Sequence, residues 1–176
     1  MVTWMRLLRK PTIYPEGMYR VPAVSHAPIE PHVCVVEPDM EGGLTLWASE
    51  QGGVRYQQFV CDLFGYQPSK VRFITPYIGG AFGAKCDLLV TPIAVMLAMK
   101  SKHAVRLEMS REEVFVHGDP RGSAIVWIKD GIMKDGTIVA RQIKEILDGG
   151  AYSGYVTGFV HSLVQNVLQT LRYGIN

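Results

Sequence analysis

The feature that most constrains the fold of this chain is a glycine-rich segment, YIGGAFGAKC, at residues 77–86. It follows VRFIT (71–75), a run typical of a strand, and precedes the apolar stretch LLVTPIAVMLAM (88–99). We interpret that stretch as a buried helix with Pro92 in its first turn, because it is too short to cross a bilayer. A strand, a glycine loop and a helix in this order are typical of a domain that mixes sheets with helices.

The glycine segment fits neither of the two familiar phosphate-binding motifs. Gly79 and Lys85 have the spacing of G-x-x-x-x-G-K-[ST], but alanine replaces the second glycine and Cys86 replaces the hydroxyl residue that binds magnesium. The dinucleotide fingerprint G-x-G-x-x-G fails as well, since Gly79, Gly80 and Gly83 give G-G-x-x-G. Two interpretations remain: an anion-binding nest of backbone amides, or a turn that needs glycine only for its geometry.

The remaining pattern predicts an α+β (mixed α/β) domain, with a mixed β-sheet and packed helices. Runs rich in β-branched and aromatic residues predict strands at 33–37, 44–49, 71–75, 105–109, 123–129 and 137–147. Apolar residues at helical spacing predict helices at 54–65, 88–99 and 158–171. The sequences D-M-E-G-G and K-D-G predict hairpins between the first two strands and between the last two.

Composition narrows the class of protein. The chain has 176 residues, 48% of them hydrophobic and 19% charged, with a net charge of +2 from scattered basic residues. We therefore expect a globular protein that binds neither nucleic acid nor membrane. Its three cysteines, Cys34, Cys61 and Cys86, form no C-x-x-C motif and no disulfide framework, which favours a reducing compartment and predicts a cytoplasmic protein.

Five segments, in this order, resemble the molybdenum-binding (large) subunit of the xanthine dehydrogenase, aldehyde oxidase and hydroxybenzoyl-CoA reductase family. They are HAPIEPH (26–32), LTLWASEQGG (44–53), YIGGAFGAK (77–85), SREEVFVHGDPRG (110–122) and KDGTIVARQIKEILDGGAYSGY (134–155). The resemblance spans about residues 18–170. It implies an N-terminal extension over residues 1–17 and a partial molybdopterin-binding domain over 18–176, which is one lobe of the complete domain.

The resemblance implies that the glycine loop lies against a molybdenum pterin cofactor. The cofactor-binding residues would be Gly79, Gly80, Ala81, Phe82 and Gly83, whose backbone would approach the cofactor. Ala81 replaces a glycine of the family, so it must keep a negative φ for the loop to retain its shape.

Three further residues gain functions from the resemblance. Gln51 matches a glutamine that hydrogen-bonds to an oxygen of the molybdenum group; alternatively, it is an ordinary loop residue before two glycines. Arg121 matches an arginine that directs substrate in some members; alternatively, it is a solvated loop residue. Cys86 stands where purine-oxidising members have a substrate-contacting glutamate, so purines are not the expected substrates.

No metal site is expected from side chains. His26, Glu30 and His32 are close in sequence, but Pro28 and Pro31 prevent a helix that would bring them onto one face, and the segment is structural in the family.

The chain also lacks the G-x-G-E segment that carries the family's base glutamate, so we expect no catalytic residue in it. The resemblance implies that this glutamate lies in the remainder of the molybdenum subunit, and that iron–sulfur clusters and FAD lie on other subunits. Two hypotheses stay open. The chain is part of a molybdenum hydroxylase or dehydrogenase that oxidises an aldehyde, an aromatic heterocycle or an aryl-CoA, or it is a non-catalytic remnant or interaction domain. We expect the isolated chain to be inactive and to self-associate.

Overall fold

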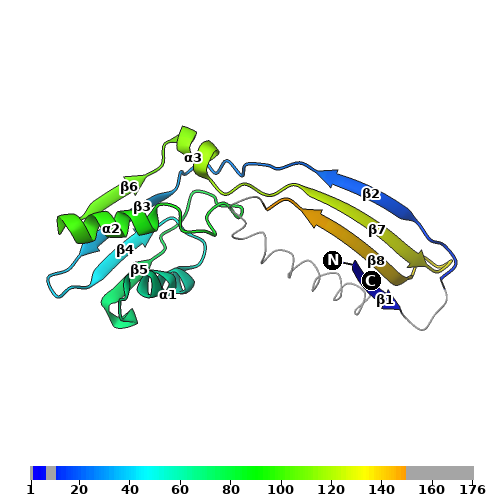
Figure 1. Ribbon diagram of the computed structural model, residues 1–176, viewed down its shortest axis with the longest axis horizontal. Helices are drawn as coiled ribbons and strands as arrows, with labels where there is room; N and C mark the ends of the chain where they lie inside the picture. Colours follow the sequence, from blue (N-terminus) through cyan, green and yellow to red (C-terminus); the bar gives the residue numbers. More distant parts are fainter. Residues whose placement is uncertain (1, 7–10, 150–176) are drawn as a thin grey trace. The chain divides into compact units, whose positions relative to one another are not determined.

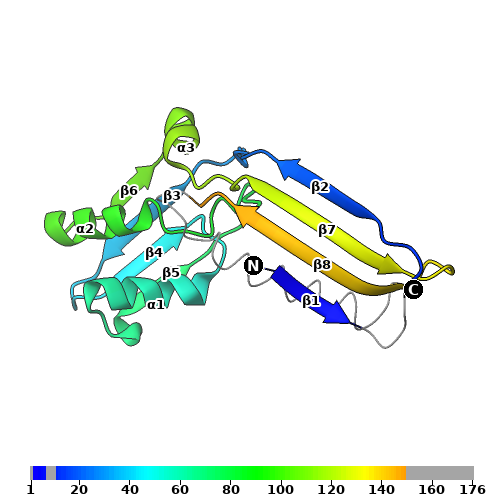
Figure 2. The same cartoon turned by 45° about the vertical axis from the view of Figure 1, so that its right-hand side comes forward.

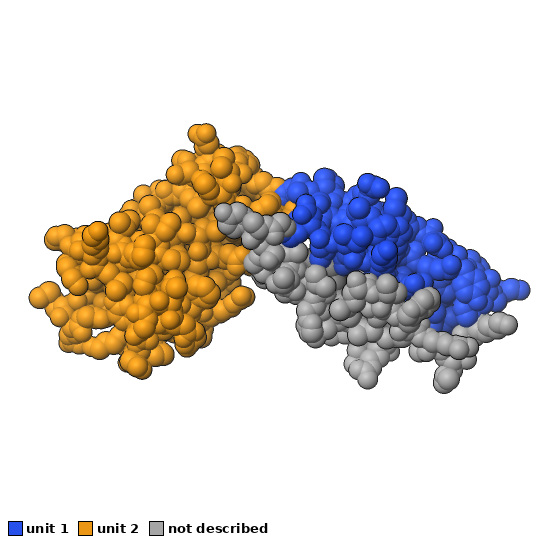
Figure 3. Space-filling view, in the orientation of Figure 1, with its two compact units in different colours: residues 1–24, 122–176 blue, residues 25–121 orange. Residues whose placement is uncertain are grey.

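The computed structural model of the chain describes residues 2–6 and 11–149. It divides into two compact units, coloured separately in Figure 3. Unit 1 combines residues 1–24 with 122–176, and unit 2 consists of residues 25–121. Each unit holds a four-stranded sheet of its own. Three helices accompany these sheets in the described residues, which confirms the predicted mixture of helices and mixed sheet.

The sheet of unit 2 has the strand order β5-β4-β3-β6. Its strands are β3 (Val33–Pro38), β4 (Leu44–Ala48), β5 (Val71–Ile74) and β6 (Val105–Glu108). β3 is antiparallel to both of its neighbours, whereas β4 and β5 are parallel. Parallel neighbours need a crossover connection, and α1 (Gly53–Phe64) provides it.

The turn between β3 and β4 is built around one carboxylate. Asp39 Oδ1 accepts hydrogen bonds from the amides of Glu41 (2.8 Å) and Gly43 (2.7 Å). An aspartate that binds the backbone of its own turn is a common way to close a loop. The hairpin expected from D-M-E-G-G is therefore confirmed.

α1 and α2 (Thr91–Ser101) cover the same face of this sheet (Figures 1 and 2). Buried residues alternate along β3 and β4, as expected for strands with one face in the core. The core joins these strand residues to buried residues of both helices: Cys34, Val36, Leu44, Leu46, Ala48, Val60, Cys61, Val71, Val90, Ala94, Val95 and Ala98. α1 ends at Gly65 in the left-handed conformation (φ 73°), as its sequence predicts.

Two details differ from the expectations. α2 begins at Thr91, not at residue 88, because the backbone of the glycine loop continues in turns beyond Gly83, for example Cys86 N to Gly83 O at 3.3 Å. Pro92 still occupies the first turn. A short helix, α3 (Arg111–His117), was not predicted, although S-x-x-E at its start is a capping box that the structure forms.

Unit 1 contains an antiparallel sheet with the order β1-β8-β7-β2. Its strands are β1 (Val2–Arg6), β2 (Glu16–Val21), β7 (Ala124–Ile132) and β8 (Ile138–Leu147). The β7-β8 hairpin was predicted; β1 and the start of β2 lie within the expected extension, 1–17. The helix predicted at 158–171 lies outside the described residues. Over the part that the structure covers, no helix is long and apolar enough to cross a membrane.

Candidate functional site

The glycine-rich loop of unit 2 has an unusual backbone. Gly80, Phe82 and Gly83 have positive φ angles of 95°, 56° and 104°. Ala81 is not among the residues with positive φ, so it meets the condition that its replacement of glycine imposes. Phe82 is 74% exposed and adopts the left-handed region, which is sparsely populated by aromatic residues and which clusters at functional sites.

The loop presents adjacent backbone donors. The amide of Gly83 donates to Gln51 Oε1 at 3.0 Å. The amides of Gly80, Ala81 and Phe82, in contrast, donate to no acceptor within the residues that the structure describes. Alternating φ signs around unpaired amides are the geometry of a backbone nest that binds anions or oxygen atoms. Of the two interpretations of the glycine pattern, this geometry favours the nest.

Gln51 lies beside this loop, as the prediction of a shared site requires. It comes three residues after β4 ends at Ala48, and its own amide donates to Lys85 O at 2.9 Å. Its side-chain oxygen accepts from Gly83 N, and the Cys86 thiol lies 3.5 Å from the same oxygen. Because an amide N–H can only donate, the acceptor must be the oxygen, which leaves Nε2 as the donor end of the side chain.

Cys86 also contacts the side-chain oxygen of Gln51, through its thiol. Tyr56 OH donates to the carbonyl of Cys86 at 2.6 Å, which ties this part of the loop to α1. Burial, followed by the charge of Asp87, raises the pKa of the Cys86 thiol above its usual value. The residue is therefore a neutral thiol near pH 7 and does not supply a thiolate ligand or nucleophile.

The segment after α3 contains Asp119, whose carboxyl group lies near that of Asp87, the residue after Cys86. Burial and then the charge of Asp87 raise the pKa of Asp119, which indicates that the two carboxylates are close. Arg121, predicted as a candidate substrate residue, is exposed at the end of unit 2. Its contact with substrate stays a prediction.

Glu50, the neighbour of Gln51, was missed by the sequence reading. Its side chain is 1% exposed, and Oε1 accepts a hydrogen bond from Thr91 Oγ1 at 3.2 Å. Oε2 has no hydrogen-bond partner among the described residues. Burial raises the pKa of Glu50 to about 8, so the carboxyl group is largely neutral at pH 7. A glutamate at a strand end carries no sequence signal for burial.

The segment 26–32 does not form a metal site. No group of three or more potential metal-ligating side chains occurs in the described part of the chain. Instead, Glu30 pairs with Lys85 at 2.6 Å, and the lysine side chain is fully buried. Lys85 therefore does not extend towards a phosphate, as the lysine of a phosphate loop would.

Comparisons with known proteins give the family. The model of the molybdopterin cofactor-binding domain matches residues 8–175. The nicotinate dehydrogenase large molybdopterin subunit of Eubacterium barkeri is 34% identical over 140 residues, which are 80% of this chain and 33% of that protein. The xanthine dehydrogenase molybdenum-binding subunit of Escherichia coli O157:H7 is 28% identical over 78% of this chain and 18% of its own length.

Solved structures show the same fold. The aldehyde oxidoreductase of Desulfovibrio gigas matches with a TM-score of 0.68 at 19% identity, over 78% of this chain and 16% of that one. The CO dehydrogenase of Oligotropha carboxidovorans matches with a TM-score of 0.65 at 26% identity, over 73% of this chain and 16% of that one. The chain thus spans a third or less of each of these relatives. It belongs to the molybdopterin cofactor-binding domain family.

Proposed function

We propose that this chain forms one wall of the molybdenum pterin site of a molybdenum hydroxylase, and that the opposite wall comes from the remainder of the molybdenum subunit. The observation that supports this most strongly is the contact between Gln51 and Gly83 beside three unpaired amides. The family match fixes the kind of cofactor. The chain matches 33% and 18% of two homologous subunits, and we assign the opposite wall to the part of such a subunit that lies outside the match.

The residues present fit such a cofactor. A large anionic group with oxygen atoms requires hydrogen-bond donors, and the amides of Gly80, Ala81 and Phe82 have no acceptor among the described residues. Gly83 has a φ that disfavours any side chain, and a Cβ atom there would lie 3.3 Å from His26 Nε2. Nε2 of Gln51 adds one side-chain donor whose orientation is fixed by Gly83.

The bound cofactor would supply the two-electron oxidation and oxygen transfer. The chain's own residues would bind and orient it: the loop through its amides, Gln51 through Nε2. We do not assign the base to Glu50, because its buried carboxyl group accepts from Thr91 and is largely neutral. We place the base on the remainder of the subunit, and the iron–sulfur clusters and FAD on partner subunits.

The substrate class we propose is an aldehyde, an aromatic heterocycle or an aryl-CoA thioester. Cys86 presents a neutral thiol where purine-oxidising members have a glutamate, so the polar contact that a purine would use is missing. A relative named for nicotinate, which is an aromatic heterocycle, supports one of these classes.

Molybdenum-containing relatives of this chain differ in length. The alignment covers 140 residues in both the nicotinate dehydrogenase subunit and a hypoxanthine oxidase relative, but these are 33% of the former and 14% of the latter. The nicotinate dehydrogenase subunit is therefore less than half as long. The length of a molybdopterin subunit therefore varies among these relatives.

The test is to produce the chain together with its genomic neighbours and to purify the complex through a tag on this chain. We expect the complex to release a fluorescent oxidised pterin and to oxidise at least one compound from a panel of aldehydes, N-heterocycles and aryl-CoA thioesters. A complex that contains the neighbouring chains but no pterin would overturn the proposal in favour of a non-catalytic remnant.

A further inference from the structure

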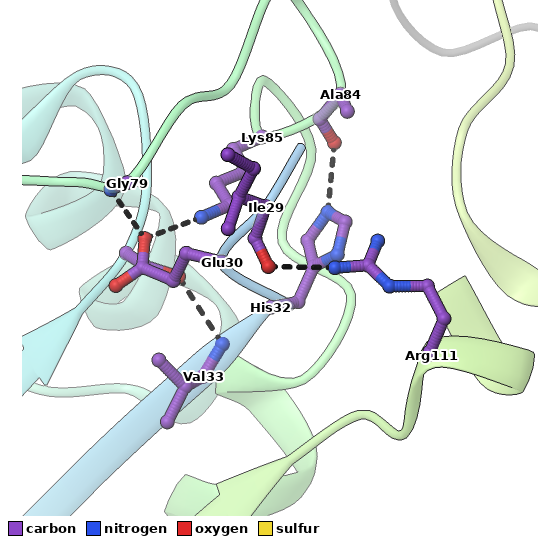
Figure 4. A network of polar contacts seen from close by, with 9 residues as sticks. Ile29, Glu30, His32, Val33, Gly79, Ala84, Lys85 and Arg111 are labelled. Atoms are coloured by element: carbon purple, nitrogen blue, oxygen red, sulfur yellow. Dashed lines mark hydrogen bonds and ion pairs between the residues drawn. The ribbon is translucent and has the colours of Figure 1, made fainter. Parts of the chain in front are cut away.

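The glycine loop is held at its start by a carboxylate from a distant segment (Figure 4). Glu30 Oε2 accepts hydrogen bonds from Gly79 N at 2.9 Å and from Lys85 Nζ at 2.6 Å. The backbone amide of Glu30 donates in return to Gly79 O at 3.2 Å. One side chain therefore joins two points of the loop that are six residues apart in sequence.

Burial of the Lys85 ammonium group makes its ion pair with Glu30 necessary for a stable loop. The side chain of Lys85 is fully buried, whereas that of Glu30 is 30% exposed. A buried ammonium group without a partner is strongly unfavourable, so the carboxylate must remain beside it. Burial raises the pKa of Glu30, but the hydrogen bonds from Lys85 and Gly79 outweigh this effect and leave the pKa below its usual value. The carboxylate is therefore ionised at neutral pH.

A second contact fixes the end of the loop. His32 is fully buried, and its Nε2 lies 2.9 Å from Ala84 O. A carbonyl oxygen can only accept, so Nε2 carries the proton. Burial lowers the pKa of His32 and keeps the ring neutral. Its Nδ1 has no partner among the described residues, so the Nε2 bond is the polar contact that orients the ring.

Close packing accompanies these hydrogen bonds. A Cβ atom on Gly79 would lie 2.7 Å from Glu30 Cβ, which is closer than such atoms approach. The guanidinium group of Arg111 donates to Ile29 O at 2.6 Å and ties the same segment to α3. The segment 29–32 is thus fixed on one side by α3 and fixes the loop on the other.

We propose that Glu30 is a positioning residue: its carboxylate, with Lys85, clamps Gly79 and thereby holds the amides of the glycine loop in place for the cofactor. This inference rests on the proposed function for its last step, the effect on the cofactor. The clamp itself is a property of this chain and can be measured without cofactor.

The variants are chosen so that no buried charge is left unpaired. Glu30→Gln with Lys85→Met removes both charges but keeps an oxygen that accepts from Gly79 N. Glu30→Ala with Lys85→Met removes both charges and the acceptor. The two double variants therefore differ in the acceptor for Gly79 N and in the length of the side chain at position 30. Glu41→Gln, which alters an exposed ion pair with Lys70, is the control for a loss of charge elsewhere in unit 2.

Hydrogen exchange of the full chain measures the clamp. We expect the Gly79 amide to exchange about tenfold faster in the alanine double variant than in the glutamine one, as the loss of one hydrogen bond allows. We expect the Gly83 amide to exchange faster in the alanine double variant as well. Amides of β3 and β4 should stay protected in both double variants. Equal exchange at Gly79 in both variants would overturn the clamp. So would a general loss of protection in unit 2, because the contact would then serve the fold as a whole.

Molybdenum content of the assembled complex measures the effect on the cofactor. We expect the alanine double variant to retain several-fold less molybdenum than the glutamine double variant, with Glu41→Gln equal to the wild type. If the wild-type complex contains molybdenum and both double variants retain equal amounts of it, the positioning role of Glu30 is overturned, but the proposed function is not. A wild-type complex without molybdenum would overturn the proposed function, while the exchange result would still stand for the clamp.

Discussion

The side-chain oxygen of Gln51 accepts a hydrogen bond from the backbone amide of Gly83 at 3.0 Å. This contact joins the segment after β4 to the glycine loop after β5, across 32 residues of sequence. It fixes which end of the glutamine amide is free to donate. The loop and Gln51 therefore form one structural unit, and variants of either should impair the proposed cofactor site.

Gln51→Ala is expected to weaken the oxidation of substrate by the assembled complex. The substitution removes the Nε2 donor and also leaves Gly83 N without its acceptor. We expect a loss on the order of 1–3 kcal/mol in transition-state stabilisation, measured as kcat/KM. Gln58→Ala is the matched control, because Gln58 is exposed on α1 and bonds to Asp62 in the same helix. Unchanged kcat/KM in the Gln51 variant would contradict its assignment to the site.

Gly83→Val is expected to abolish molybdenum binding, not just to slow turnover. Valine disfavours the φ of 104° and adds bulk where we place the cofactor; the added Cβ also lies 3.3 Å from His26 Nε2. Gly42→Val is the control, since Gly42 also has positive φ (78°) but nothing within 4 Å of the added atom. Both variants bear the backbone strain, so only a difference in molybdenum content between them supports the site. Equal content would refute it.

Local patterns predicted most of the secondary structure in the described residues. The β3-β4 hairpin followed from turn residues around Asp39, and the end of α1 followed from Gly65, because both depend on neighbours in sequence. α3 was missed although Ser110 and Glu113 form a capping box, a signal that was present but not used. These features needed no knowledge of the rest of the fold.

The candidate site was only partly predictable. The proximity of Gln51 to the glycine loop was expected from a family resemblance and is confirmed, whereas contact of either with a cofactor stays a prediction. The positive φ of Phe82 and the burial of Glu50 depend on contacts between distant segments, so no local pattern indicates them. The same holds for the pairing of Glu30 with Lys85, which lie 55 residues apart. The family resemblance suggested candidate residues, and tertiary packing decided what each one contacts.

Stability should fall as pH rises towards 8 because of Glu50. Its pKa is about 8 in the folded chain, above the ordinary value of 4.5, so the folded state binds more protons between these values. The contribution of protonated Glu50 to the free energy of unfolding is complete below about pH 4.5 and is lost as pH rises through 8. The free energy of unfolding falls by at most about 1.4 kcal/mol per pH unit in this range. Urea unfolding at pH 6 and 8.5 should show a smaller decrease for Glu50→Gln than for the wild type. Parallel decreases in the two proteins would contradict this assignment.

The isolated chain is expected to form dimers or larger assemblies. Large apolar side chains are exposed on α1 and α2, and such surfaces favour association. They are Phe59, Leu63, Ile93, Met96 and Leu97. Light scattering should give a mass of at least two chains for the wild type and a smaller mass for Leu63→Lys with Met96→Lys. Gln58→Lys, which adds charge at a polar position of α1, should behave as the wild type. A monomeric wild type would contradict the prediction.

The most direct test of the central claim is the molybdenum content per chain, measured by elemental analysis on the isolated chain and on its complex with neighbouring gene products. One wall offers three loop amides and one glutamine donor, and each solvent-exposed hydrogen bond contributes no more than about 0.5–1.5 kcal/mol, too little to hold a large anionic cofactor tightly. Our account predicts molybdenum in the complex and none in the isolated chain. Stoichiometric molybdenum with dehydrogenase activity in the isolated chain, or a complex without the metal, would contradict it.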